Sequence, residues 1–187
     1  MRFLALSGSL RRASVNSALL RAAARLAPET VEVHVYTGLG ALPLFNPDDE
    51  AAPPEAVQDF WRAVAQADAL VVASPEYAHG VTGTIKNALD WLVGFEPFAH
   101  KPVAVVNTSP RAHHADAALR ETLTTMAACI VEAASVSIPL LGAHLDEEGM
   151  LASPESVAAI GALLLALAEG VAQAQAQKPG SPPGHLL

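Results

Sequence analysis

Hydrophobic and polar positions follow two alternating patterns along this chain. Short apolar stretches predict strands, and the stretches at 69–73 and 103–106 contain no polar side chain at all. Such continuous runs are typical of strands covered on both faces, because a strand with one face in water alternates instead. The predicted strands are residues 2–7, 31–36, 68–74, 102–108 and 130–138.

Between the predicted strands, apolar residues recur every three or four positions, which is the spacing of one helix face. The last of these helices begins at Ser153-Pro154, a capping residue followed by a first-turn proline. The predicted helices run from about residues 15 to 26, 53 to 64, 85 to 94, 115 to 128 and 153 to 171.

Strands that alternate with helices imply an α/β domain, a parallel sheet with helices on both faces. We expect one domain over residues 1–176, and a disordered tail at 177–187, which is rich in proline and glycine. In such sheets ligands bind at the carboxyl ends of the strands, near the point where the strand order reverses. The candidate binding loops are therefore residues 7–16, 74–83 and 107–114.

Composition narrows the classes of function. The net charge of −8 offers no broad positive field for nucleic acid, so any anion site is expected to be local. The single cysteine, Cys129, excludes an internal disulfide and fits a cytoplasmic protein, and its apolar neighbours predict a buried thiol. The apolar stretch at 157–171 is interrupted by Gly161, Glu169 and Gly170, so we expect no membrane segment.

The first loop, Ser7-Gly-Ser-Leu-Arg-Arg-Ala-Ser-Val-Asn-Ser17, joins the first strand to the first helix. A helix N-terminus offers free N–H groups, to which this loop adds hydroxyls, an amide and the Arg11 guanidinium, so the loop could hold a phosphate. Alternatively, Ser14 or Asn16 only caps the helix and the arginines are solvated. The loop has neither the P-loop lysine nor three spaced glycines, so it indicates neither a nucleotide hydrolase nor a dinucleotide-type first turn.

The loop after the third strand begins Ser74-Pro-Glu-Tyr77. Pro75 fixes the backbone as it leaves the sheet. Tyr77 could supply an aromatic edge for a flat ligand, and N–H groups near residues 77–80 could bond to ring oxygens. A plain helix-entry turn, with Lys86 and Asp90 as a surface ion pair, explains the same residues and is the favoured interpretation of this loop taken alone.

Together, Gly8-Ser-Leu-Arg-x-x-Ser-x-Asn16 and Pro75-Glu-Tyr-x-His, followed by Gly83-Thr-Ile-Lys-Asn-Ala-Leu-Asp-Trp91, resemble the NAD(P)H-dependent FMN reductase family. The similarity includes 42–48 and 145–151 and covers about residues 1–170. The resemblance implies a flavodoxin-like three-layer fold with a five-stranded parallel sheet in the order 2-1-3-4-5. It also implies bound FMN, NADPH or NADH as co-substrate, a small-molecule acceptor such as a quinone, flavin or azo compound, and a homodimer or homotetramer.

By this resemblance, two groups of residues would hold FMN. The first loop would bind the phosphate, with Ser9, Leu10, Arg11, Ser14, Val15, Asn16 and Ser17. The third- and fourth-strand loops would border the isoalloxazine ring, with Pro75, Glu76, Tyr77, Ala78 and Ser109. No catalytic side chain is expected, because the flavin carries the chemistry.

The chain departs from the family pattern near the ring. Ala78 stands where asparagine is common, Thr82 where proline is common, and His113-His114 where glycines are common. Flavin affinity and acceptor choice should be decided at these positions. A flavodoxin-like electron carrier without direct NAD(P)H use and a flavin-free family member are the alternatives, and the arginine in the first loop favours the reductase.

Two other kinds of site, a metal site and a serine hydrolase site, lack their sequence motifs. The chain has seven histidines but no His-Glu-x-x-His and no paired cysteines, so we expect no metal site, although His79 and His113 could meet at the pocket mouth. Gly-x-Ser-x-Gly is also missing, which argues against a serine hydrolase.

Arg111 either pairs with the extra phosphate of NADPH or is an exposed arginine at a helix start. Leu20 and Leu165 are expected on apolar helix surfaces that mediate oligomerisation.

Overall fold

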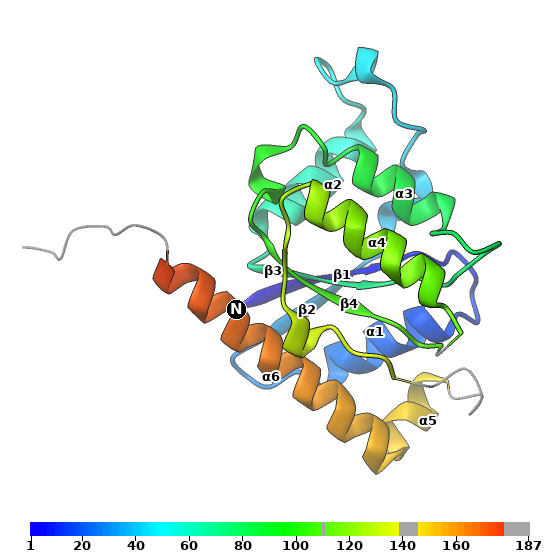
Figure 1. Cartoon of the computed structure of the whole chain (residues 1–187), viewed down its shortest axis with the longest axis vertical. Helices are drawn as coiled ribbons and strands as arrows, with labels where there is room; N and C mark the ends of the chain where they lie inside the picture. The colour runs from blue at the N-terminus through cyan, green and yellow to red at the C-terminus, as the bar shows by residue number, and fades with distance from the viewer. Residues whose placement is uncertain (110, 139–145, 178–187) are drawn as a thin grey trace, which may run out of the picture.

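A computed structural model describes residues 1–109, 111–138 and 146–177 (Figure 1). Its core is a parallel sheet with the strand order β2-β1-β3-β4-β5. The strands are β1 Arg2–Ser7, β2 Glu32–Tyr36, β3 Ala69–Ala73, β4 Pro102–Val106 and β5 Cys129–Ile130. The predicted α/β architecture and strand order are confirmed.

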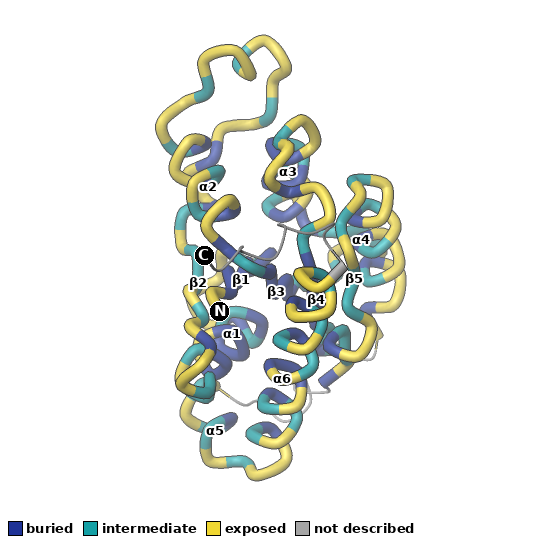
Figure 2. Tube along the Cα trace, turned by 90° about the vertical axis from the view of Figure 1, so that its left-hand side faces the viewer, coloured by how far each residue is buried: buried dark blue, intermediate teal, exposed yellow. Residues whose placement is uncertain are grey.

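Helices cover both faces of the sheet (Figures 1 and 2). One face packs against α1 Val15–Leu26, α5 Glu147–Ala152 and α6 Pro154–Gln177. The other packs against α2 Glu55–Gln66, α3 Gly83–Asp90 and α4 His113–Thr125. In the described residues, short 3₁₀ helices lie in the connections, at Gly38–Ala41, Pro47–Asp49, Glu96–Phe98 and Glu132–Ala134.

The continuous apolar runs are explained by these two layers of helix. Within β1, Phe3 and Ala5 belong to the core beneath α1 and α6, whereas Leu4 and Leu6 belong to the core beneath α2 and α3. Because successive side chains of a strand point to opposite faces, a strand between two helical layers must be apolar at every position.

The fifth strand is much shorter than the predicted 130–138. Pairing with β4 ends after Ile130 and returns only as a single bridge between Asn107 and Ser137. The Ser135 hydroxyl explains the gap, since it accepts a hydrogen bond from the Val105 N–H at 3.0 Å. A side chain thus takes the place of a strand carbonyl, while Glu132–Ala134 forms a 3₁₀ turn.

Several other sequence-based expectations need correction. Cys129 is exposed on the edge strand and is not the buried thiol that its apolar neighbours predicted. Leu20 is fully buried and cannot form an oligomer surface, whereas Leu165 is 58% exposed. Helix α4 stops at Thr125, before the predicted 128, because Ala127 has a φ of 60° and cannot continue a right-handed helix. Residues 178–187 of the predicted tail lie outside the described residues.

Helix α6 is strongly apolar. By length and composition alone, Pro154–Ala176 could span a membrane, and it is the one such helix in the described part of the chain. Ile160, Leu164 and Leu167 are buried against the sheet, while 28% of the apolar window as a whole is buried.

Candidate functional site

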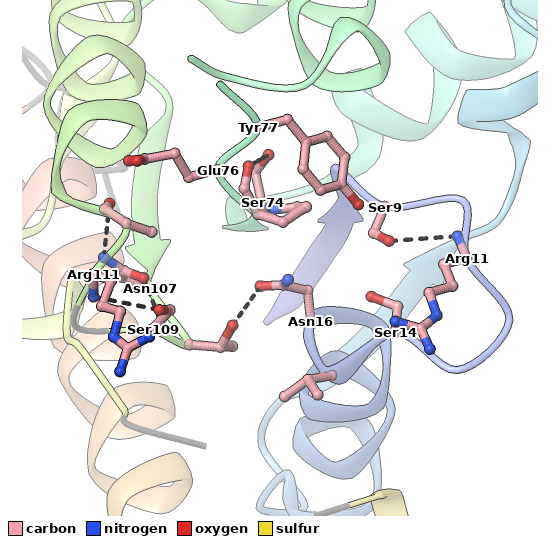
Figure 3. A pocket seen from close by; sticks show the side chains of 14 residues that line it. Ser9, Arg11, Ser14, Asn16, Ser74, Glu76, Tyr77, Asn107, Ser109 and Arg111 are labelled. Carbon is pink, nitrogen blue, oxygen red and sulfur yellow. Dashed lines mark hydrogen bonds between the residues drawn. The ribbon is translucent and has the colours of Figure 1, made fainter. Parts of the chain in front are cut away.

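A cavity of about 550 Å³ lies where β1, β3 and β4 end (Figure 3). Its size is within the range of small-molecule and cofactor sites. Its walls come from the three loops that the sheet topology indicated, namely from Ser9, Arg11, Ser14, Val15, Asn16, Ser74, Pro75, Glu76, Tyr77, Asn107, Thr108, Ser109, Arg111 and Ala112.

Gly8 lets two of these loops run side by side. Its N–H donates to the Ala73 carbonyl at 2.8 Å. A Cβ on Gly8 would lie 2.2 Å from the Ser74 Oγ and 2.6 Å from the Ser74 Cβ, distances that real Cβ atoms do not show. The close packing of the β1 and β3 loops therefore requires a glycine at this position, next to Ser9 and Ser74 of the cavity lining.

The first loop forms a cationic end of the cavity. Ser14 is the N-cap of α1 and accepts a hydrogen bond from the Ser17 N–H at 3.3 Å, as the capping alternative predicted. The first turn of α1 contains no acidic residue, and the N–H groups of Val15 and Asn16 have no acceptor within the helix. No carboxylate in the described part of the chain forms an ion pair with Arg11. An anion is the natural complement of this end.

Side chains of the fourth-strand loop tie it to the rest of the cavity. The Thr108 hydroxyl donates to the Oδ1 of Asn16 at 3.0 Å, and both side chains are buried. Asn107 shapes its own loop, because its Oδ1 accepts from the Ser109 N–H at 2.9 Å and its Nδ2 donates to the Ala112 carbonyl at 3.1 Å. The wall formed by the fourth-strand loop is therefore held by one buried and two partly buried hydrogen bonds.

The other wall includes Tyr77, which begins a tight turn at residues 77–80. Tyr77 and Gly80 exchange backbone hydrogen bonds of 3.1 and 2.9 Å. The two central residues, Ala78 and His79, have φ values of 49° and 60°, as a type I′ turn requires. Neither is glycine, so the turn has a conformation that costs free energy for both residues. Tyr77 remains 60% exposed at the cavity.

Replacing Ala78 by asparagine should stabilise the protein by about 1 kcal/mol, because asparagine adopts the left-handed conformation more readily than alanine. Thermal unfolding checks this expectation. Ala51→Asn is the matched control, because Ala51 is exposed and is not among the residues with positive φ. An equal effect of both substitutions would contradict the explanation by backbone strain.

Glu76 links this wall to helix α4. Its Oε2 accepts a hydrogen bond from the Ala115 N–H at 2.8 Å. This bond lowers the pKa of Glu76 below its ordinary value, loss of solvation opposes the change, and the nearby His114 and His79 add to the lowering. Because the pKa is lower in the folded state, the contact stabilises the fold above the ordinary glutamate range and loses its effect as the pH falls through the folded value.

Three of the histidines, His79, His113 and His114, lie at the same place. The rings of His79 and His114 are stacked, with centroids 4.3 Å apart and planes 15° apart. His79 therefore meets His114 and not His113, whose own ring lies against His114 at 4.2 Å. Among the described residues, no group of three or more histidines, cysteines or carboxylates could hold a metal ion.

Most of the residues that the resemblance indicated line this cavity. They are Ser9, Arg11, Ser14, Val15, Asn16, Pro75, Glu76, Tyr77 and Ser109. The other three lie outside its lining: Leu10 is exposed, the Ser17 hydroxyl bonds to that of Ser7 at 2.7 Å, and Ala78 is at the tip of the turn.

The lining also contains residues that the sequence interpretation did not assign to FMN, namely Ser74, Asn107, Thr108, Arg111 and Ala112. Their place directly after β3 and β4, inside the indicated loops, was the available signal. Arg111 lies across the cavity from Arg11 (Figure 3).

Comparison with protein families gives a match over most of the chain. The model described as NADPH-dependent FMN reductase matches residues 1–141. A quinone reductase of Pseudomonas putida is 35% identical over 153 residues, which cover 77% of this chain and 81% of that protein. An NAD(P)H-dependent FMN reductase of Pseudomonas aeruginosa is 38% identical over 112 residues, which cover 58% of this chain and 60% of that protein.

Solved structures agree with these matches. FerB of Paracoccus denitrificans, a flavoenzyme NAD(P)H:(acceptor) oxidoreductase, superposes with a TM-score of 0.76 at 27% identity and covers 92% of this chain and 97% of its own. A flavodoxin of Pseudomonas aeruginosa superposes with a TM-score of 0.53 at 16% identity and covers 87% of this chain and 99% of its own. At that identity the likeness concerns the flavodoxin-like fold alone.

Proposed function

Because the chain belongs to the NADPH-dependent FMN reductase family, we propose that its cavity binds FMN and that the protein transfers electrons from NADPH or NADH to quinone-type acceptors. The observation that carries the proposal is one cavity that brings Arg11, which pairs with no carboxylate among the described residues, and the N-terminus of α1 together with Pro75 and Tyr77. The quinone and FMN reductases among the relatives support the reaction class.

The residues present fit FMN at its phosphate end. The guanidinium of Arg11, the hydroxyls of Ser9 and Ser14 and the N-terminus of α1 all border one end of the cavity. Such a donor set suits a dianionic phosphate monoester, which accepts charge-assisted hydrogen bonds on several oxygens. Asn16 contributes its amide nitrogen, because its oxygen is already bonded to Thr108.

The other end fits a planar ring. Pro75, Glu76 and Tyr77 would border one side, and Ser109 with Asn107 the other. When bound, FMN would supply the redox chemistry by accepting a hydride from the nicotinamide and passing electrons to the acceptor. The protein binds, orients and shields, and no side chain needs to act as acid or base.

Arg111 is the candidate contact for the co-substrate. It lines the cavity opposite Arg11, and no carboxylate in the described residues forms an ion pair with it. We expect Arg111→Ala to raise the KM for NADPH by roughly tenfold, the equivalent of about 1.4 kcal/mol. An unchanged KM for NADH would assign Arg111 to the 2′-phosphate, and equal increases would assign it to the diphosphate. Unchanged KM values for both would contradict the contact.

Steady-state turnover tests the proposed function as a whole. The purified protein is loaded with FMN and given NADPH or NADH together with a benzoquinone. Oxidation of the nucleotide that depends on both FMN and quinone is expected. Full flavin loading without any nucleotide oxidation would contradict the reductase and favour an electron carrier.

A homodimer or homotetramer and a cytoplasmic location also belong to this proposal. The exposed Leu165 on α6 is one apolar side chain available for subunit contact. A monomer mass in light scattering at working concentration would contradict the oligomer.

A further inference from the structure

Two loops from different strands border the ring end of the cavity, and side chains of the third-strand loop contact the start of α4. The third-strand loop contributes Glu76 and His79, and the start of α4 contributes His114 and the Ala115 N–H. The contacts are the Glu76–Ala115 hydrogen bond of 2.8 Å and the stacked rings of His79 and His114 at 4.3 Å. They join residues that are 35 to 39 positions apart in the sequence.

The conformation of His79 is what presents its ring to His114. His79 has a φ of 60°, in a turn whose other central residue, Ala78, also has a positive φ. Histidine is unfavourable there compared with glycine, so the turn is strained. Strain of this kind persists where surrounding contacts determine the conformation, and the ring stack is the contact made by the strained residue.

Glu76 connects the cavity to helix α4. Its side chain lines the cavity, while its carboxylate binds the N-terminal turn of α4, which no residue of the helix itself caps with a side chain. The negative carboxylate therefore lies at the N-terminus of α4, where the helix dipole is positive and stabilises it. The contact holds the third-strand loop against the start of α4.

We propose that Glu76, His79 and His114 form a clasp that fixes the separation of the two walls bordering the flavin ring. His79 and His114, which lie outside the cavity lining, are then positioning residues for the ring end of the site. This inference rests on the proposed function for the identity of the ligand. The clasp acts through the walls that carry Tyr77 and Ser109. Its effect should therefore be the same for any flavin with an isoalloxazine ring, with or without a phosphate.

Flavin titration of the apoprotein separates this effect from phosphate binding. For His114→Ala and Glu76→Ala, the dissociation constants of FMN and riboflavin should both rise about three- to tenfold, the scale of an aromatic pair or a capping contact. His114→Phe keeps a ring for stacking and should restore wild-type affinity. His34→Ala, which removes an exposed histidine on β2, is the matched control and should leave both constants unchanged.

Turnover supplies a further readout. With saturating FMN, the loss in His114→Ala should appear in kcat more than in the KM for NADPH, because the proposed role of the clasp is to set the position of the ring. Unchanged affinity for both flavins in both alanine variants, or loss of FMN affinity alone, would overturn the proposal. A phenylalanine variant as weak as the alanine variant would also contradict the role of stacking.

The free energy of unfolding of the apoprotein tests whether the clasp exists, without any flavin. In a double-mutant cycle of His79→Ala and His114→Ala, the two shifts in stability should be clearly non-additive, because each substitution removes the same contact. Additive shifts would overturn the clasp. Failure of the wild-type protein to bind either flavin would instead contradict the proposed function, and the unfolding cycle would still decide whether the clasp exists.

Discussion

Replacing Arg11 by alanine will weaken FMN binding by roughly 10- to 100-fold, because a hydrogen bond to a charged partner contributes about 1.5–3 kcal/mol. The guanidinium borders the end of the cavity that α1 makes positive, and no described carboxylate neutralises it. Quenching of flavin fluorescence during titration of the apoprotein measures the change.

Arg12→Ala provides the matched control for that experiment. Arg12 is the next residue in the same loop and carries the same charge, but it does not line the cavity. Its removal tests whether a general loss of positive charge weakens binding. Equal losses in the two variants, or unchanged affinity in Arg11→Ala, would contradict the assigned role of Arg11.

Replacing Gly8 by alanine will destabilise the protein by about 1–3 kcal/mol or more, because the new methyl group must displace well-packed neighbours. The atom it meets at 2.6 Å is the Ser74 Cβ, which is attached directly to the backbone and cannot rotate away. The β1 and β3 loops must separate, and FMN affinity should fall with stability. Denaturant unfolding and flavin titration measure the two effects.

Gly83→Ala is the control for the glycine substitution. Gly83 lies in the first turn of α3, and a Cβ there meets nothing within 4 Å. We expect unchanged or slightly higher stability, since alanine favours helix more than glycine does. A Gly8→Ala protein as stable as Gly83→Ala would show that the two loops are not packed as closely as described.

The sheet was predictable because its strands are local patterns. A strand buried on both faces is apolar at every position, and β3 and β4 show this in the sequence itself. The end of β5 was not predictable, because Val131 and Val136 look like strand residues. What interrupts the strand is a hydrogen bond from Val105 to the Ser135 hydroxyl, a contact between distant parts of the chain.

The candidate site, like the sheet, has parts that the sequence predicts and parts that it does not. Ser9, Arg11 and Ser14 belong to one loop whose spacing shows a strand followed by a capped helix. The pairing of Thr108 with Asn16 spans 92 positions, and no local pattern reveals it. The positions at which the chain differs from the family pattern are explained only by the structure. Thr82 is the N-cap of α3, and its hydroxyl accepts a hydrogen bond from the Ile85 N–H at 3.3 Å. The ring of His114 stacks on that of His79.

Comparing FMN with riboflavin tests most directly whether the first loop holds the FMN phosphate. Riboflavin has the same ring and lacks the phosphate, so the difference in affinity isolates the loop of Arg11 and α1. We predict that the apoprotein binds FMN at least about tenfold more tightly than riboflavin, and that Arg11→Ala removes most of this difference. Equal affinities of the wild-type protein for the two flavins would contradict the account.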